Sequence, residues 1–376
     1  MPKIKTDKSG PGSNIREERI YAKSIGVKSP TTMNKEELDE AVRRRELELG
    51  ITRGKHSIYD YTAEERETLE PGLRGKHRTI QMSSGFFHAF EEGDGVLRRD
   101  PFEPLPEADV YVPKTLVDKC RLREGDRITG NVAVLFYNKL KVLKTVRYVD
   151  GDAMVRSAVR TAFEDMLRDK PSRKADIHGN HSMVAILDRV LSFGMGESLV
   201  ICGRNEENSS YFDKAAAALF KGFCAGFDGI VYGVFEGNRE YKAMLTGVYN
   251  PETTIFNGDE EGAAFMREMI KRSVERRENS VVVINAPTFD VRPFLEAAAA
   301  YQGASVTVIA FTDKFYEADA HVTFEGNTIN CTETGNSLAA YICGPERYRA
   351  SNRALLRIGS ATPDDLLAKF TEYVNE

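Results

Sequence analysis

The residues best placed to do chemistry lie in the polar loop 203–210, directly after an apolar run at 198–202. A strand, a glycine-led loop and a helix can together hold phosphate, because backbone N–H groups at the helix start point at the anion. Ser209 adds a hydroxyl that could hold Mg²⁺. Glu206 and Glu207 oppose this chemistry, since two like charges about 4 Å apart repel by about 4 kcal/mol at an effective dielectric of about 20.

Two further polar residues end neighbouring apolar runs. Asn285 follows 281–284, and Glu236 follows 230–235. Asn285 is a neutral ligand and therefore a weaker one than a carboxylate for a hard cation.

The elements that must position these residues alternate between strand and helix after residue 150. Apolar strands are expected at 198–202, 230–235, 281–284 and 306–311. Helices are expected at 210–225, at 260–277, from Pro293 to Gly303 and after Thr362. This alternation, with β-branched strands, predicts a parallel, doubly wound sheet.

Residues 80–148 follow a different pattern, with short alternating runs separated mostly by Gly- or Pro-containing turns. The runs are Phe86–Phe90, Gly95–Leu97, Asp109–Val112, Arg127–Val134 and Leu140–Val146. Five short strands in about 70 residues suit a small barrel such as the OB-fold.

The first 79 residues are more polar. Residues 1–14 are rich in Gly, Pro, Ser and Lys and are expected to be disordered. A helical module and linker is expected over 15–79, with helices near 15–25 and after Asn34, where Glu37 completes a capping box. The domains expected are therefore 1–14, 15–79, 80–148 and 150–376.

Composition limits the function classes. A net charge of −5 argues against an indiscriminate polyanion binder, and 41% hydrophobic residues fit a globular protein. No apolar run approaches the roughly 20 residues that span a bilayer, and the N-terminus lacks a signal-like apolar region. The five cysteines form no C-x-x-C pair. We therefore expect a cytoplasmic protein with no metal site, no disulfide framework and no membrane partner.

Four stretches resemble, in order, the bacterial transcription termination factor Rho family. They are IYAKSIGVKSPTTMNKEELDEAV (20–42), DVYVPKTLVDKCRLREGDRITGNV (109–132), FEGNREYKAM (235–244) and GPERYRASNRALL (344–356). The resemblance implies a multidomain α/β chain with an N-terminal helical module, an OB-fold RNA-binding barrel and a RecA-like doubly wound ATPase domain.

The resemblance also implies roles for the 203–210 loop. An active family member has a lysine and a glycine here, which Asn208 and Glu207 replace, whereas Ser209 keeps the hydroxyl and Ser210 follows it. Asn285 stands where the family has an aspartate that organises Mg²⁺. The nucleotide-binding residues are thus vestigial, and a pseudo-ATPase without ATP or Mg²⁺ as cofactor is expected.

Two vestigial catalytic positions are kept. Glu236 matches the glutamate that polarises the attacking water, and Arg353 matches the arginine offered to a neighbouring subunit's nucleotide. A lone Glu or Arg also commonly has a structural role. The alternative left open is an active RNA-dependent ATPase and helicase that uses ATP and Mg²⁺.

The RNA-binding segment of the family is half kept. Asp94 and Val96 replace its two base-stacking aromatics. The residues that resemblance assigns to RNA binding are Arg98, Tyr111, Phe136 and Lys139. Single-stranded RNA, bound weakly or in an altered way, is therefore the expected partner.

The expected function is a non-catalytic Rho-like protein in transcription termination or RNA metabolism. The possible protein partners are Rho itself, RNA polymerase and further copies of the chain. A protein-interaction scaffold that binds neither RNA nor nucleotide is the third reading.

Overall fold

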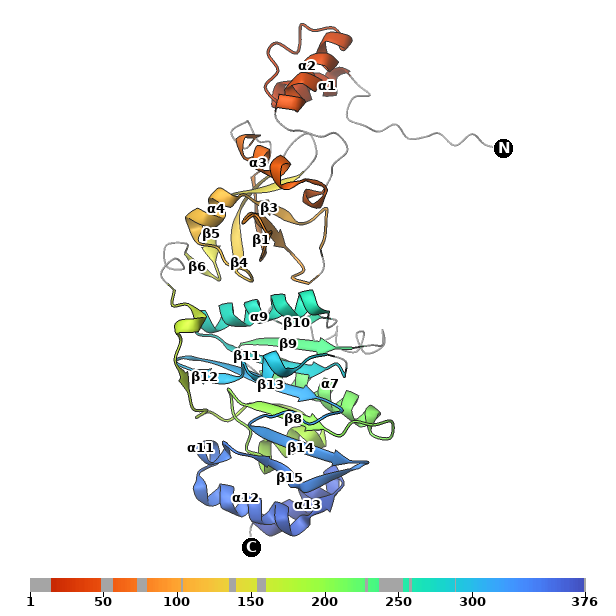
Figure 1. Cartoon of the computed structure of the whole chain (residues 1–376), viewed down its shortest axis with the longest axis vertical. Coiled ribbons are helices and arrows are strands. Elements are labelled where there is room, and N and C mark those ends of the chain that lie inside the picture. The colour runs from red at the N-terminus through yellow and green to blue at the C-terminus, as the bar shows by residue number, and fades with distance from the viewer. Residues whose placement is uncertain are drawn as a thin grey trace, which may run out of the picture. The chain divides into compact units, whose positions relative to one another are not determined.

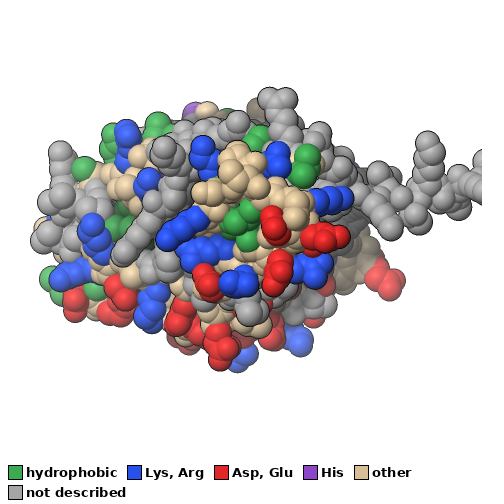
Figure 2. Space-filling model, turned by 90° about the horizontal axis from the view of Figure 1, so that it is seen from above, with side chains coloured by type: hydrophobic (Ala, Val, Ile, Leu, Met, Phe, Trp, Pro, Cys, Tyr) green, Lys and Arg blue, Asp and Glu red, His purple; other side chains and the backbone are tan. Residues whose placement is uncertain are grey.

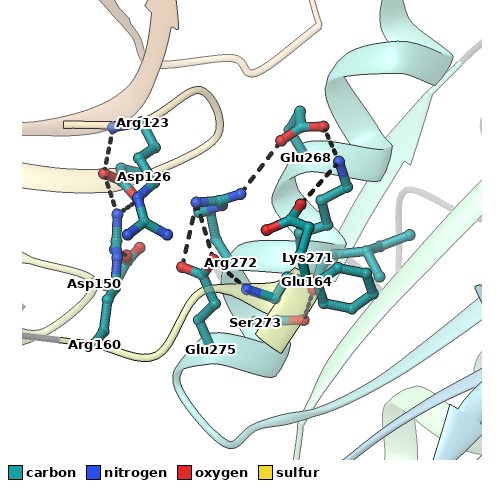
Figure 3. Close-up of polar contacts among 12 residues, drawn as sticks. Arg123, Asp126, Asp150, Arg160, Glu164, Glu268, Lys271, Arg272, Ser273 and Glu275 are labelled. Atoms are coloured by element: carbon teal, nitrogen blue, oxygen red, sulfur yellow. Dashed lines mark hydrogen bonds and ion pairs between the residues drawn. The ribbon is translucent and has the colours of Figure 1, made fainter. Parts of the chain in front are cut away.

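The computed structural model describes residues 15–48, 57–72, 80–102, 104–134, 140–153, 160–226, 229–236, 253–256, 259–287 and 289–374. Contacts divide the chain into two compact units, Met1–Arg160 and Thr161–Glu376. The division falls later than residue 150 because the Arg160 guanidinium pairs with barrel carboxylates, 2.6 Å from Asp126 and 2.7 Å from Asp150 (Figure 3).

The first unit begins with two helices, α1 (Ile15–Ser24) and α2 (Lys35–Glu48), which form their own small core. The predicted capping box is confirmed. The Asn34 side chain accepts from the Glu37 N–H at 2.9 Å, and the Glu37 carboxylate accepts from the Asn34 N–H at 3.0 Å. Residues 1–14, expected to be disordered, lie outside the described residues.

The larger part of the first unit is a closed barrel (Figure 1). Its strands are β1 (Ile80–Ala89), β2 (Gly95–Arg98), β3 (Val110–Val112), β4 (Arg127–Val134), β5 (Lys141–Val149) and β6 (Asp152–Ala153). The order is β3-β2-β1-β4-β5-β6, and a parallel pairing of β3 with β5 closes five strands into the barrel. Helix α4 (Lys114–Cys120) connects β3 to β4. The predicted five-stranded barrel is confirmed.

Two short helical elements precede the barrel, η1 (Ile58–Asp60) and α3 (Ala63–Gly72). Ser57 caps η1 through a capping box with Asp60. The Thr62 side chain and Glu65 form the same reciprocal pair at the start of α3.

The second unit is built on a large sheet with the order β10-β9-β11-β13-β8-β14-β15-β16. From β10 to β14 along this path, neighbouring strands pair in parallel, which confirms the predicted parallel sheet. The strands of the path are β8 (Ser198–Cys202), β9 (Ile230–Phe235), β10 (Thr253–Phe256), β11 (Asn279–Asn285), β13 (Ala304–Phe311), β14 (Ala320–Glu325), β15 (Thr328–Asn336) and β16 (Ser360–Ala361).

Helices cover both faces of this sheet. Helix α7 (Ser209–Gly226) shares a core with Val281 and Val283 of β11. Val282 and Ile284 are equally buried and point to the opposite face, where α9 (Glu260–Glu275) contacts β11 and β13. The remaining elements are η2 (Phe163–Asp165), β7 (Arg168–Asp169), α6 (Ser182–Ala185), η3 (Ile186–Val190), α10 (Arg292–Leu295), α11 (Ala339–Cys343), α12 (Pro345–Ile358) and α13 (Pro363–Val374).

The helix predicted from Pro293 to Gly303 is wrong beyond its first turn. Helix α10 ends at Leu295, and Ala299–Tyr301 forms strand β12, which pairs with β13 and β7. The alanine run favours a helix locally, but the turn at Gly303, where φ is +83°, folds the chain back into a hairpin with β13.

The start of the second unit is fixed by a buried ion pair on α9 (Figure 3). The Arg272 guanidinium lies 3.1 Å from the Glu275 carboxylate, and both side chains are almost fully buried. The same carboxylate accepts a hydrogen bond from the Phe163 N–H at 3.0 Å. This pairing satisfies both charges and holds η2 against α9.

Within the described ranges, every helix is too short or too polar to cross a bilayer.

One buried carboxylate makes the stability of the second unit depend on pH. Glu197 is fully buried, and burial raises its pKa from 4.5 to about 7, although hydrogen bonds from the Gly194 N–H and the Asn336 amide oppose the rise. The folded state therefore binds this proton more tightly than the unfolded state, so stability falls as pH rises from about 4.5 to about 7.

We expect Glu197→Gln to stabilise the second unit above pH 7 by up to roughly 3 kcal/mol, because it removes a buried charge whose pKa rises from 4.5 to about 7. The gain should shrink towards zero at about pH 4.5, as denaturant titrations at several pH values would reveal. Glu372→Gln, at an exposed position, is the control and should show no such trend. A gain that does not change with pH would contradict the assignment.

Candidate nucleic-acid interface and nucleotide loop

The loop after β8 lies at the carboxyl edge of the sheet, where the strand order reverses around β8. Gly203 has φ +90°, and a Cβ atom there would collide with the Phe324 carbonyl of β14. Only glycine therefore lets the loop pass so close to the neighbouring strand. The fold thus places the 203–210 loop where a phosphate-binding loop is expected.

The backbone donors of this loop are already engaged within the protein. The Asn205 side-chain oxygen accepts from the N–H groups of Glu207 and Asn208, at 2.9 and 3.1 Å. The Asn208 side-chain oxygen accepts from the Asn205 N–H at 2.8 Å. The Arg204 N–H donates to the Thr312 carbonyl. Four N–H groups that could face a phosphate are thus directed at protein oxygens.

Asn208 also uses its amide nitrogen inside the protein. It donates to the carbonyls of Gly203, at 2.9 Å, and Gly326, at 2.8 Å, and the residue is 1% exposed. Gly326 lies in the two-residue turn between β14 and β15. Asn208, predicted to replace the phosphate-binding lysine, therefore joins two loops instead of facing solvent.

A guanidinium lies among the other predicted nucleotide-site residues. Arg204 donates to the side chains of Asn285 at 2.6 Å, Asp213 at 2.9 Å and Ser209 at 3.1 Å. The Asn285 amide donates to the same Asp213 oxygen at 2.9 Å. The cluster neutralises its own charges, and it occupies the space between Ser209 and Asn285 where Mg²⁺ and phosphate were considered.

The structure brings most of the predicted nucleotide-site residues to one edge. The Glu236 N–H donates to the Asn285 carbonyl at 3.1 Å, so the predicted glutamate also reaches this edge. Ser210 is exposed in the first turn of α7. Arg353 is exposed on α12, and no described hydrogen bond or ion pair joins it to the loop. Arg204 and Asp213 were not among the predicted site residues.

The second candidate site is the outer face of β2, β3 and β5 in the barrel. Alternation along the strands points Leu97, Val110 and Leu143 into the barrel core. Val96, Tyr111 and Val142 therefore point outwards, yet they are 0, 2 and 0% exposed. They belong to a separate cluster that includes Ile58, Tyr61 and Leu69 of residues 57–72. We call residues 57–72 the cover segment.

Tyr111, predicted to stack on a base, is buried instead. Its ring lies under the cover segment, and its hydroxyl donates to the Arg66 carbonyl at 3.3 Å. Full burial of an Ile or Leu side chain contributes about 1.5–3 kcal/mol, so Ile58 and Leu69 hold the segment in place. The prediction failed to anticipate this because residues 51–79 are polar overall, and only the apolar group IYDY signals a docking segment.

Arg98, predicted to contact RNA, is 6% exposed beneath the same segment. Its Nε donates to the Tyr59 hydroxyl at 3.3 Å, and that hydroxyl donates to Asp109 at 2.6 Å. Burial, together with the hydrogen bond to Asp109, raises the pKa of Tyr59 to about 12. Burial also raises the pKa of Asp109. The remaining predicted RNA-binding residues, Phe136 and Lys139, lie outside the described residues.

Arg66 of α3 joins the cover segment to the barrel through ion pairs. Its guanidinium lies 2.7 Å from Asp94 and 2.8 Å from Glu92, and it sits 4.4 Å from the centre of the Phe90 ring. Asp94 is 4% exposed. The acid that replaces a base-stacking aromatic is thus neutralised by an arginine of the same chain.

The face of the molecule drawn in Figure 2 carries Lys and Arg side chains intermixed with Asp and Glu. Such a mixture provides no extended positive surface on that face for sequence-independent binding to a polyanion.

Comparison with known proteins agrees with the barrel. The family model described as "Rho termination factor, RNA-binding domain" matches residues 83–154. The transcription termination factor Rho of Streptobacillus moniliformis is 23% identical over 225 residues, which are 56% of this chain and 53% of that protein. The chain therefore contains a barrel that resembles the Rho RNA-binding domain. The resemblance drawn from the sequence is confirmed, and the match spans about half the length of this curated relative.

The family match runs from within β1 to just past β6, so it covers the barrel almost completely. The cover segment and the loop after β8 both lie outside that match. The cover segment precedes the matched range in sequence and packs against its barrel.

We expect Asn208→Ala to destabilise the second unit by about 2 kcal/mol, because it takes the Asn208 donor away from the part-buried carbonyls of Gly203 and Gly326. Asn208→Asp should destabilise it at least as much, since a carboxylate cannot donate to either carbonyl. Asn327→Ala is the matched control at an exposed position of the adjoining turn and should change stability little. Equal denaturation midpoints for Asn208→Ala and Asn327→Ala would refute this role.

Proposed function

We propose that this chain is an RNA-binding protein that acts in transcription termination or RNA metabolism without hydrolysing ATP. The proposal that the chain binds RNA rests on the family match over residues 83–154, which spans the barrel. The Streptobacillus relative is a transcription termination factor, which supports a role in termination. Single-stranded RNA is the proposed ligand.

The proposed loss of ATP hydrolysis is supported by the loop after β8. Phosphate binding needs free backbone donors, a cation and a metal-holding acid. Here the N–H groups of residues 204, 205, 207 and 208 donate to protein oxygens, and the Arg204 guanidinium is held by Asp213 and Asn285. A nucleotide would have to break this network before gaining any contact, and it would meet Glu206 and Glu207 while doing so.

Rho and RNA polymerase are the proposed protein partners, through which a chain without ATP hydrolysis could still modulate termination. Purified Rho and purified polymerase, each tested for binding to the full chain by analytical ultracentrifugation, would decide between them. The same runs would measure self-association of this chain.

We expect no binding of a fluorescent ATP analogue with Mg²⁺ up to roughly 1 mM, which corresponds to about −4 kcal/mol of binding free energy. RNA should also stimulate no phosphate release. A catalytically active Rho serves as the positive control for both assays. Tight Mg-ATP binding would instead favour an active ATPase in which Arg204 leaves Asp213 and replaces the missing lysine.

We expect the full chain to bind a labelled pyrimidine-rich RNA at low salt, with affinity falling as salt rises. Phe136→Ala should weaken binding about tenfold, since stacking on an aromatic contributes roughly 1–3 kcal/mol per base. Lys139→Ala should also weaken binding and reduce its salt dependence, because it removes a positive charge available to the phosphate backbone. Phe315→Ala, at a phenylalanine 65% exposed in the second unit, is the control. If neither RNA nor nucleotide binds, the scaffold reading replaces this one.

A further inference from the structure

We propose that the cover segment, residues 57–72, is an intramolecular lid on the RNA-binding face of the barrel, and that single-stranded RNA must displace it to bind there. The inference rests on the proposed function, because it concerns the regulation of that same face.

The closed state is defined by side chains that point outwards from the barrel yet are buried. Val96, Tyr111 and Val142 do not belong to the barrel core, and each is at most 2% exposed. Ile58, Tyr61 and Leu69 of the cover segment lie in the same cluster. With the segment in place, the outer faces of β2 and β3 offer no open ring or apolar surface to a base.

Displacement would release the chemistry that single-stranded nucleic acid needs. Arg98 is buried under Tyr59, and Arg66 is paired with Asp94 and Glu92. Opening removes Tyr59 from Arg98, releases Arg66 from Asp94 and Glu92, and uncovers the rings of Tyr111 and Phe90, which the segment now contacts. Cations that track a phosphate backbone, together with aromatic rings on which bases stack, are the components of a single-strand binding groove.

The same contacts indicate why RNA is a suitable competitor. Arg66 is held mainly by two carboxylates, and a phosphate backbone supplies the same type of partner to a guanidinium. In the open state Asp94 and Glu92 are without Arg66 and repel that backbone, a cost that the contacts of RNA with Arg66 and the uncovered rings must outweigh. The apolar contacts of Ile58 and Leu69 set how hard the segment is to displace.

The test weakens the lid by substitutions in the cover segment alone. We expect Ile58→Ala with Leu69→Ala in the full chain to bind labelled single-stranded RNA at least tenfold more tightly than the wild type. Leu366→Ala removes an equally buried leucine from α13 in the second unit and should leave RNA affinity unchanged. A milder variant, Tyr59→Phe, tests the lid even if the double variant does not fold. It removes only the hydroxyl that bridges Arg98 and Asp109, and it should tighten RNA binding two- to fivefold.

Hydrogen exchange of the wild-type chain gives an independent readout. Amides of residues 63–72 should exchange faster when RNA is bound, whereas those of β11 should not change. Equal RNA affinity of wild type and variants, with unchanged exchange, would overturn the lid and leave RNA binding intact. Weaker binding by the variants would make the segment part of the RNA site instead of a barrier. No RNA binding by any form would overturn the proposed function and the lid together.

Discussion

Two loops that end parallel strands of the second unit depend on one side-chain amide, that of Asn208. Because Gly203 must pass directly against the Phe324 carbonyl, the loops after β8 and β14 meet with their backbones in contact, and their carbonyls need a shared donor. The amide supplies it, and its oxygen simultaneously folds the loop back on itself. The position of Arg204, and through it the pairing of Asp213 with Asn285, follows from that closed loop.

In both the barrel and the large sheet, an arginine neutralises an acidic side chain at the candidate site. At each candidate site an acid lies where a ligand with phosphate would place negative charge, and at each an arginine of the same chain neutralises it. Asp94 is paired with Arg66, and Asp213 with Arg204. A buried or half-buried carboxylate is costly unless paired, so these arginines are structural requirements of the acids. Both sites are consequently self-sufficient in the absence of a ligand.

Much of this architecture is predictable from the sequence, because the spacing of apolar residues along a strand or helix indicates which of its faces is buried. The strands at 198–202 and 230–235 were predicted with the observed bounds, and the capping box after Asn34 was read from residue types alone. Strand β1 begins at Ile80 and not at Phe86, because Gln81, Ser83 and Ser84 interrupt the apolar pattern while pairing with β4. Strand β12 was missed because pairing with β13 overrides a local helix preference.

The candidate sites were harder to foresee, because their geometry depends on contacts between residues far apart in the sequence. Tyr111 has the residue type and position of a stacking residue, and only the docking of Ile58, Tyr61 and Leu69 decides that it is covered. Likewise, Arg204 could have faced a phosphate, and its orientation is set by Asp213, nine positions later on α7, and by Asn285 on β11. No pattern in the sequence assigns a partner to either residue.

The Arg204 network also constrains how this loop can change over generations. Asn208→Lys alone would remove the donor to two carbonyls and place an ammonium group close to a guanidinium that is already paired. Asn285→Asp alone would lose the amide that donates to Asp213 and set two carboxylates side by side. Each single step towards a nucleotide loop is therefore destabilising before it is useful. Single substitutions in this loop therefore disturb the network, and a lysine at position 208 with an aspartate at 285 would need compensating changes elsewhere.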